Sequence, residues 1–189
     1  MIITGGTGNG FALGVNSENR AVVEAISSTV EHHINHHGKA AYNAVFTATS
    51  EAAVTRCFYY MKNDDDVDMC IEGLWLNIDK ATTITVQLNN IGDPDSGTAI
   101  TPAILNAGAV ASASGTFEYG ADLGNAGATL TGGVLSEQFV YTGARESHYV
   151  NFEQDIILPK NTVLTLWTSA ATTLVNATVV FNYHAEEGS

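Results

Sequence analysis

Hydrophobic and polar residues alternate along residues 54–78, VTRCFYYMKNDDDVDMCIEGLWLNI, in the pattern of two β-strands joined by a polar loop at 63–66. Successive side chains of a strand point to opposite faces, so Phe58 and Tyr60 should share one face of the first strand. The residues expected to share a face of the second strand are Val67, Met69 and Ile71. We therefore predict a β-hairpin here, at the centre of a β-sheet.

The alternation changes phase at Gly73. Before this glycine the apolar residues of the second strand occupy odd positions, and after it they are Leu74, Leu76 and Ile78. An extra residue in one strand shifts the phase in this way, and glycine is common at such places. The pattern predicts a β-bulge at Gly73.

The same alternation predicts strands on both sides of the hairpin, at 42–49, 82–88, 147–158, 162–169 and 173–184. Their apolar residues recur at every second position over most of each stretch. The residues expected to share one face of each strand are Tyr42, Ala44, Phe46 and Ala48; Thr82, Ile84, Val86 and Leu88; His148, Val150, Phe152, Ile156 and Leu158; and Val175, Ala177, Val179, Phe181 and Tyr183. The strand at 162–169 is expected to be mostly buried, with Leu164, Leu166 and Trp167.

Two other stretches have weaker patterns. Residues 98–143 are rich in Ala, Gly, Ser and Thr, and only short strands are expected there, near 98–105, 115–119 and 128–134. Residues 20–37 fit either a helix face or the even positions of a strand, through Val22, Ile26, Val30 and Ile34. The Val, Ile, Thr and Ser content favours the strand.

Eight or more short strands separated by turn residues are typical of a β-sandwich or jelly roll. A chain of 189 residues corresponds to one domain with a substantial core. The prediction is therefore an all-β, single-domain antiparallel β-sandwich, jelly-roll-like, over residues 20–186. A flexible glycine-rich N-terminal arm, 1–19, precedes it, and a C-terminal tail, 187–189, follows it.

The charge balance restricts the partners. The chain has 20 Asp and Glu against 7 Lys and Arg, a formal net charge of −13. Phosphate contacts require clustered cations, so nucleic acid and anionic membrane surfaces are excluded as direct partners. The N-terminus lacks the cationic and apolar regions of a signal peptide. We expect the chain to stay in a cytoplasm unless it leaves as part of a larger particle.

The histidines of EHHINHHG are the first candidate for chemistry. On a helix, the pairs His32/His36 and His33/His37 would have a metal-ligand spacing. On a strand, the members of each pair lie about four rises of ~3.3 Å apart, too far for one ion to bridge. We therefore predict no metal site here, and leave open a polar strand edge, a subunit contact or a response to pH through imidazole protonation.

No other pattern predicts catalysis. The acidic run at 64–68 and the turn at 93–97 lack the complete ligand set of a calcium loop. The glycine-rich start has no preceding strand long enough for a phosphate loop. Cys57 and Cys70 are expected to be reduced thiols, although a hairpin with a two-residue loop would place them opposite each other. We assign no catalytic, cofactor-binding or metal-binding residues, and we expect Trp75 and Trp167 in the core.

Several segments carry a family resemblance. After Asn19-Arg20, the chain has EHHINHHGKAAYN, YYMKNDDDVDMCIEGL, ILPKNTVLTLW and ATVVFNYHAEE in that order. This order resembles the small virion proteins of tailed bacteriophages, of the jelly-roll decoration (cement) type. The resemblance implies a structural protein without enzymatic activity that binds the major capsid protein on the outer surface of the head, commonly as a homotrimer. It implies assembly in the host cytoplasm, and it carries over no functional residue.

Two rival hypotheses come from other classes of protein. One is a phage tail or baseplate receptor-binding jelly roll that recognises host glycans through exposed aromatic residues, with Tyr119 and Tyr141 as candidates. The other is a metal-dependent jelly-roll enzyme that uses the histidines, in which His32→Ala would abolish activity.

Overall fold

The computed structural model describes residues 2–4, 10–12, 41–50, 55–95, 97–124, 129–143, 146–169 and 173–184. All helical or strand segments in these ranges are β-strands, so the predicted all-β class is confirmed. The strands are β1 (Ile2–Thr4), β2 (Gly10–Ala12), β3 (Ala41–Thr49), β4 (Arg56–Asn63), β5 (Asp68–Ile78), β6 (Thr82–Leu88), β7 (Thr98–Ala99), β8 (Ala103–Ile104), β9 (Gly115–Tyr119), β10 (Val134–Tyr141), β11 (Glu146–Leu158), β12 (Val163–Thr168) and β13 (Leu174–His184).

The main strands follow a nested antiparallel pairing. Strand β3 pairs with β13, β4 with β12, β5 with β11, and β6 with β10. The chain therefore forms one long hairpin, with β3–β6 as one arm and β10–β13 as the other. Winding such a hairpin over itself produces a jelly roll, and here its strands divide between two sheets. The predicted jelly-roll-like sandwich is thus confirmed.

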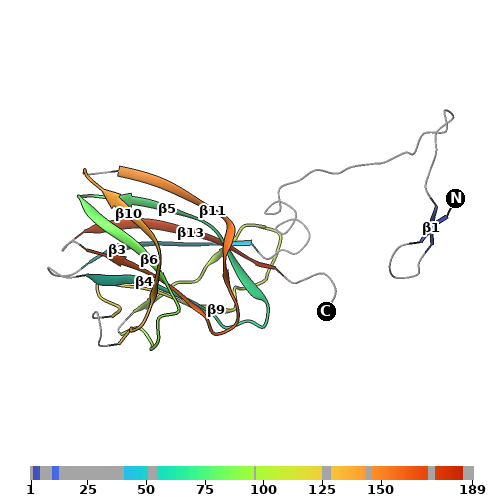
Figure 1. The fold of residues 1–189 in the computed structure, drawn as a ribbon, viewed down its shortest axis with the longest axis horizontal. Helices are drawn as coiled ribbons and strands as arrows, with labels where there is room; N and C mark the ends of the chain where they lie inside the picture. The colour runs from blue at the N-terminus through green and yellow to red at the C-terminus, as the bar shows by residue number, and fades with distance from the viewer. Residues whose placement is uncertain are drawn as a thin grey trace.

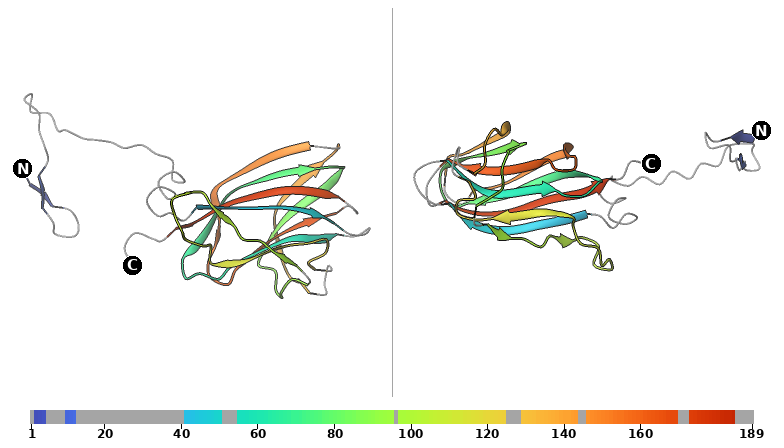
Figure 2. Two further views of the ribbon diagram at one scale, coloured as in Figure 1. Left: turned by 180° about the vertical axis from the view of Figure 1, so that it is seen from behind. Right: turned by 90° about the horizontal axis from the view of Figure 1, so that it is seen from below.

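One sheet has the order β11-β5-β13-β3-β8, and the other has the order β10-β6-β12-β4-β9-β7. Figure 1 shows β11, β5, β13 and β3 following one another across the first sheet. The strands of the sandwich run along a common long direction (Figure 2). Strands β7, β8 and β9 come from the Ala- and Gly-rich stretch and extend both sheets beyond the eight main strands.

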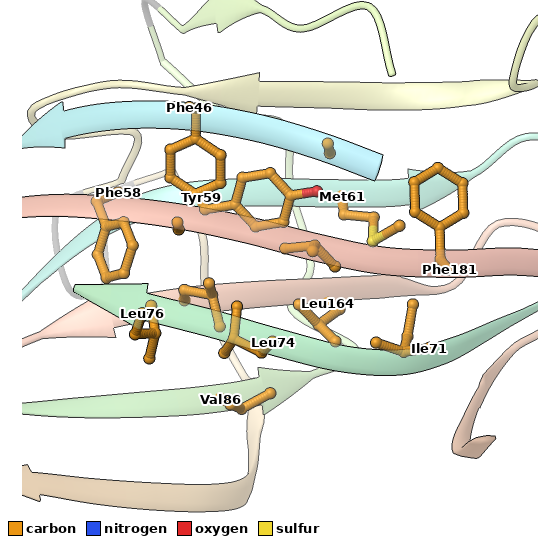
Figure 3. Close-up of a cluster of buried hydrophobic side chains, with 14 of the residues drawn as sticks. Phe46, Phe58, Tyr59, Met61, Ile71, Leu74, Leu76, Val86, Leu164 and Phe181 are labelled. Carbon is orange, nitrogen blue, oxygen red and sulfur yellow. The ribbon is translucent and has the colours of Figure 1, made fainter. Parts of the chain in front are cut away.

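The inner faces of the two sheets enclose an aromatic-rich core. Phe46 from one sheet stacks on Tyr59 from the other, with ring centroids 4.6 Å apart and ring planes 4° from parallel. Phe181 stacks in the same way on Phe117, at 5.2 Å. Figure 3 shows Phe46, Tyr59 and Phe181 together with Leu74, Leu76, Leu164 and Val86 between the sheets. Inward residues alternate with outward ones along most of β3, β6 and β13, as the sequence pattern predicts.

The predicted hairpin at 54–78 is wrong in its pairing. Strands β4 and β5 exist close to the predicted positions, but they belong to different sheets and pair with β12 and β11. The buried Asn63 side chain stabilises the crossing between the sheets, because its amide donates hydrogen bonds to the carbonyls of Val67 and Leu158, at 2.9 and 2.8 Å. A strand with one buried face fits a hairpin or a crossing equally well, so the periodicity could not identify the partner.

The predicted phase shift at Gly73 is confirmed. Val180 of β13 pairs with Gly73 of β5, and the next residue of β13, Phe181, pairs with Ile71, so Glu72 is the extra residue. A second bulge, which the periodicity did not predict, lies in β4. Leu166 of β12 pairs with Tyr59, and the next residue, Trp167, pairs with Cys57, so Phe58 is the extra residue. Because of this bulge Phe58 joins the main core, whereas Tyr60 points to the other side of the sheet; the prediction that they share a face is wrong.

Predictions elsewhere had mixed outcomes. Strand β6 occupies the predicted residues 82–88, and β12 and β13 match to within one residue at each end. The strand predicted at 128–134 is wrong: in the described residues 129–133 no strand forms, an isolated bridge joins Thr131 to Ile91, and β10 begins at Val134. Residues 20–37, the tail at 187–189 and most of the arm at 1–19 lie outside the described residues, although β1 and β2 form an antiparallel pair within the arm.

Candidate functional site

The outer face of the sheet β11-β5-β13-β3 carries an exposed aromatic row. In register across four strands lie Tyr149, Trp75, Thr178 and Val45. The side chains of Trp75 and Val45 are 53% and 62% exposed, and Tyr149 is 43% exposed. Trp75 lies between Leu74 and Leu76, which both point inward, so the alternation of the strand forces the indole outward. The prediction of Trp75 in the core is therefore wrong.

A second row of uncharged polar side chains runs beside the aromatic row. It consists of Ser147, Asn77, Asn176 and Thr47, again in register across the same four strands. Two hydrogen bonds hold it: the Asn77 amide donates to the Ser147 hydroxyl at 2.6 Å, and the Thr47 hydroxyl donates to the Asn176 carbonyl oxygen at 2.8 Å. The two rows are ~6.6 Å apart, twice the rise of a strand. We call the two rows together the Trp75 face.

A shallow cleft of about 290 Å³ lies along the Trp75 face. Its lining combines Trp75 and Val45 with the amides of Asn77 and Asn176 and the hydroxyl of Thr178, and none of its ten lining residues is charged. Binding sites for small molecules commonly combine apolar walls with a few convergent polar groups in this way. The uncharged cleft offers no counter-charge to an ionic ligand, and the net charge of −13 repels anions.

Gly73 sets the position of the aromatic pair. The rings of Trp75 and Tyr149 lie 4.5 Å apart between centroids, at 31°. The Tyr149 ring covers the backbone of Gly73, where a Cβ atom would lie only 2.5 Å from the tyrosine oxygen and 2.7 Å from Cε2. A glycine is therefore required for the tyrosine ring to lie against the strand beside the indole.

On the other sheet, the outer face of β4 and β12 is covered by a loop of the same chain. Cys57, Tyr60, Val163 and Trp167 form a second buried cluster with Leu123 and Leu130 from the loop after β9. The backbone fixes this loop, since the Leu123 amide donates to the Cys57 carbonyl at 2.8 Å. Trp167 is thus buried as predicted, but it lies under a loop and outside the main core, and its indole N–H donates to Thr165.

The aromatic residues first named for glycan recognition do not lie in solvent. Tyr141 is only 2% exposed and contacts His148 edge-on, with ring centroids 4.8 Å apart. Tyr119 is half-buried and stacks on Phe46 at 5.7 Å. That identification is wrong; the exposed aromatic residues of the described chain with a neighbouring cleft are those of the Trp75 face.

The outermost strand β10 offers a different kind of surface. It pairs with β6 on one side only, and Val134, Leu135 and Val140 are each more than half exposed. Its only charged residue is Glu137. Edge strands of soluble proteins are usually protected by charges, prolines or a covering segment, because an open edge can pair with another chain. We call β10 with these three apolar residues the β10 edge.

The two cysteines are free and buried, as expected of reduced thiols. They lie in different sheets, so the alternative in which they face each other across a hairpin is wrong. Burial raises the pKa of both thiols, and for Cys70 the nearby carboxylates Asp68 and Glu72 raise it further. Protonated thiols are poor nucleophiles, so neither cysteine resembles a catalytic group.

The acidic loop between β4 and β5 is tied to lysines. Lys160 forms a hydrogen-bonded ion pair with Asp66, at 2.5 Å, and Lys62 lies 3.4 Å from Asp64. Within the described ranges no group of three or more His, Cys, Asp or Glu side chains is arranged to hold a metal ion. Residues 32–37, with the histidine cluster, lie outside those ranges, and the prediction about them stays a prediction.

No family model, curated protein or solved structure matches this chain. Among the described residues no helix is long and apolar enough to cross a membrane.

Proposed function

We propose that this protein is a structural virion protein without enzymatic activity, a capsid decoration (cement) protein that binds the outer surface of a bacteriophage head and stabilises it. The observation that carries the proposal is the β10 edge. An apolar, almost uncharged edge strand is suited to adding strands or packing against another protein. The partners proposed for it are the major capsid protein and further copies of this chain, in a homotrimer on the capsid surface.

The charge and the shape of the sandwich support the same proposal. The net charge of −13 repels nucleic acid, so the protein would bind the shell from outside, where the packaged DNA is not in contact with it. The core joins both sheets through stacked aromatic rings, so the sandwich presents its surfaces as a rigid body. Such a body can brace neighbouring subunits of a lattice without changing shape.

Uptake onto heads that lack the protein tests this proposal. Purified protein is mixed with undecorated heads and sedimented, and saturable binding with a fixed copy number per head is expected. Val140→Lys, which places a charge on the β10 edge, should weaken uptake. The matched variant Val110→Lys should not, since Val110 is fully exposed in the loop between β8 and β9, which lie toward the other end of the strand order from β10. Absence of uptake by the unmodified protein would end the proposal.

The second candidate is a tail or baseplate module that recognises host glycans. The exposed Trp75 beside an uncharged cleft favours it, because aromatic rings and amides are the groups that contact sugars. Immunogold labelling of intact particles distinguishes the two candidates. Label on the head supports the decoration protein, and label confined to the tail supports the receptor-binding module.

A further inference from the structure

We propose that the cleft on the Trp75 face is a binding site for a neutral saccharide. The inference does not depend on the decoration function, since the Trp75 face and the β10 edge belong to different sheets. It rests on the same cleft as the second candidate, the glycan-recognition module, and names the class of ligand for it. A protein attached to a shell through the β10 edge could still present the Trp75 face to solvent.

The aromatic side of the cleft provides a platform for an apolar sugar face. A pyranose ring has one face of C–H groups, which packs on an aromatic ring with both surfaces removed from water. Trp75 exposes about half of its side chain to solvent, beside the cleft. Its orientation is fixed in advance, because the Tyr149 ring packs against it at 4.5 Å and is itself seated over Gly73.

The polar side of the cleft has unused hydrogen-bonding capacity. Asn77, which lines the cleft, donates through its amide nitrogen to Ser147, and its carbonyl oxygen remains available as an acceptor. Asn176 accepts from Thr47 through its oxygen, which leaves its amide N–H groups as donors. A sugar hydroxyl can donate and accept at the same time, so it matches one fixed acceptor and one fixed donor placed side by side.

The charges around the cleft favour a neutral ligand. None of the lining residues is cationic, so an acidic sugar would find no counter-charge on a strongly acidic protein. None is anionic, so an amino sugar with a free ammonium group would find no carboxylate in the lining. A purely apolar ligand would leave the Asn77 oxygen and the Asn176 N–H groups unpaired under a dry contact, which costs free energy.

A glycan array tests the proposal. Labelled protein is applied to printed neutral oligosaccharides of glucose, galactose, mannose and N-acetylglucosamine, and to sialylated and uronic-acid-containing oligosaccharides as the charged arm. The strongest neutral oligosaccharide is then titrated by calorimetry. We expect binding to neutral oligosaccharides that weakens about ten-fold or more in Trp75→Ala, which removes the stacking surface, and also weakens in Asn176→Asp, which removes the donor.

Val110→Ala is the matched control, because it removes an exposed valine away from the cleft and should leave binding unchanged. Circular dichroism and urea unfolding establish that each variant keeps its fold.

Binding only to the charged arm, no binding to the neutral arm, or equal affinity in Trp75→Ala would overturn the proposal. Sedimentation showing a self-association that Trp75→Ala abolishes, without saccharide binding, would assign the face to a second copy instead. Uptake onto heads is measured separately, so either result leaves the decoration proposal to its own test.

Discussion

The contact between Gly73 and Tyr149 predicts a specific coupling between two substitutions. A Cβ atom added at Gly73 would lie within 2.5 to 2.8 Å of three tyrosine ring and hydroxyl atoms, closer than real Cβ contacts come. Gly73→Ala should therefore displace the tyrosine ring and disrupt its packing on Trp75. In the double variant with Tyr149→Ala the ring is gone, and the added methyl group meets no obstacle from it.

The magnitude follows from two opposing effects. Loss of an aromatic pair costs about 0.5–1.5 kcal/mol. Replacement of glycine by alanine within a strand gains about 0.5–1 kcal/mol, because the unfolded chain loses freedom. In the natural background the two effects nearly cancel, whereas in the Tyr149→Ala background only the gain remains. The expected coupling free energy is about 0.5–1.5 kcal/mol.

Urea unfolding of the four proteins, followed by circular dichroism, measures this coupling. Tyr149→Phe is the matched control, because phenylalanine keeps the ring atoms near Gly73 and loses only the hydroxyl. The coupling should persist with phenylalanine and vanish with alanine. If the effects of Gly73→Ala and Tyr149→Ala add to within about 0.3 kcal/mol, the ring does not lie over Gly73 in solution and the reasoning fails.

Three further predictions concern the covered sheet and the buried thiols. In the native protein Cys57 and Cys70 should react with a thiol reagent at pH 8 only slowly, and completely after unfolding in urea; rapid native reaction of both contradicts their burial. Burial, reinforced by nearby carboxylates, raises the pKa of Tyr60 to about 12 from 10.0. The free energy of unfolding should therefore fall as the pH rises from about 10 to about 12, and Tyr60→Phe should make that fall smaller. Leu123→Ala should lower the free energy of unfolding by about 2–5 kcal/mol. It should also shift the fluorescence emission of Trp167 to longer wavelength, because Leu123 packs in the same buried cluster as the indole. Unchanged emission would mean that the loop stays closed without this side chain.

Much of the sandwich follows from local periodicity. Strands β6 and β13 were predictable because a buried inner face and a wet outer face impose a strict period of two on their sequences. The bulge at Gly73 was predictable because it shifts that period. The partners of β4 and β5 were not, since an inward-facing set of residues looks the same in a hairpin and in a crossing between sheets.

The surfaces were harder to predict than the core. Strand β10 was misplaced because its apolar residues do not alternate: Val134 and Leu135 are adjacent and both exposed, next to a register shift. The position of Trp75 was available in the sequence, because Leu74 and Leu76 fix the inward phase. The expectation that tryptophans lie in the core outweighed that signal, although the alternation was the stronger physical argument.

The central claim is that the protein acts by contact with other proteins through the β10 edge. Hydrogen–deuterium exchange of residues 134–141, compared between the free protein and the protein bound to phage heads, tests it most directly. These amides should exchange markedly more slowly on the heads, while peptides that contain Trp75 should exchange at the same rate in both states. Equal exchange of 134–141 in the two states would contradict the claim.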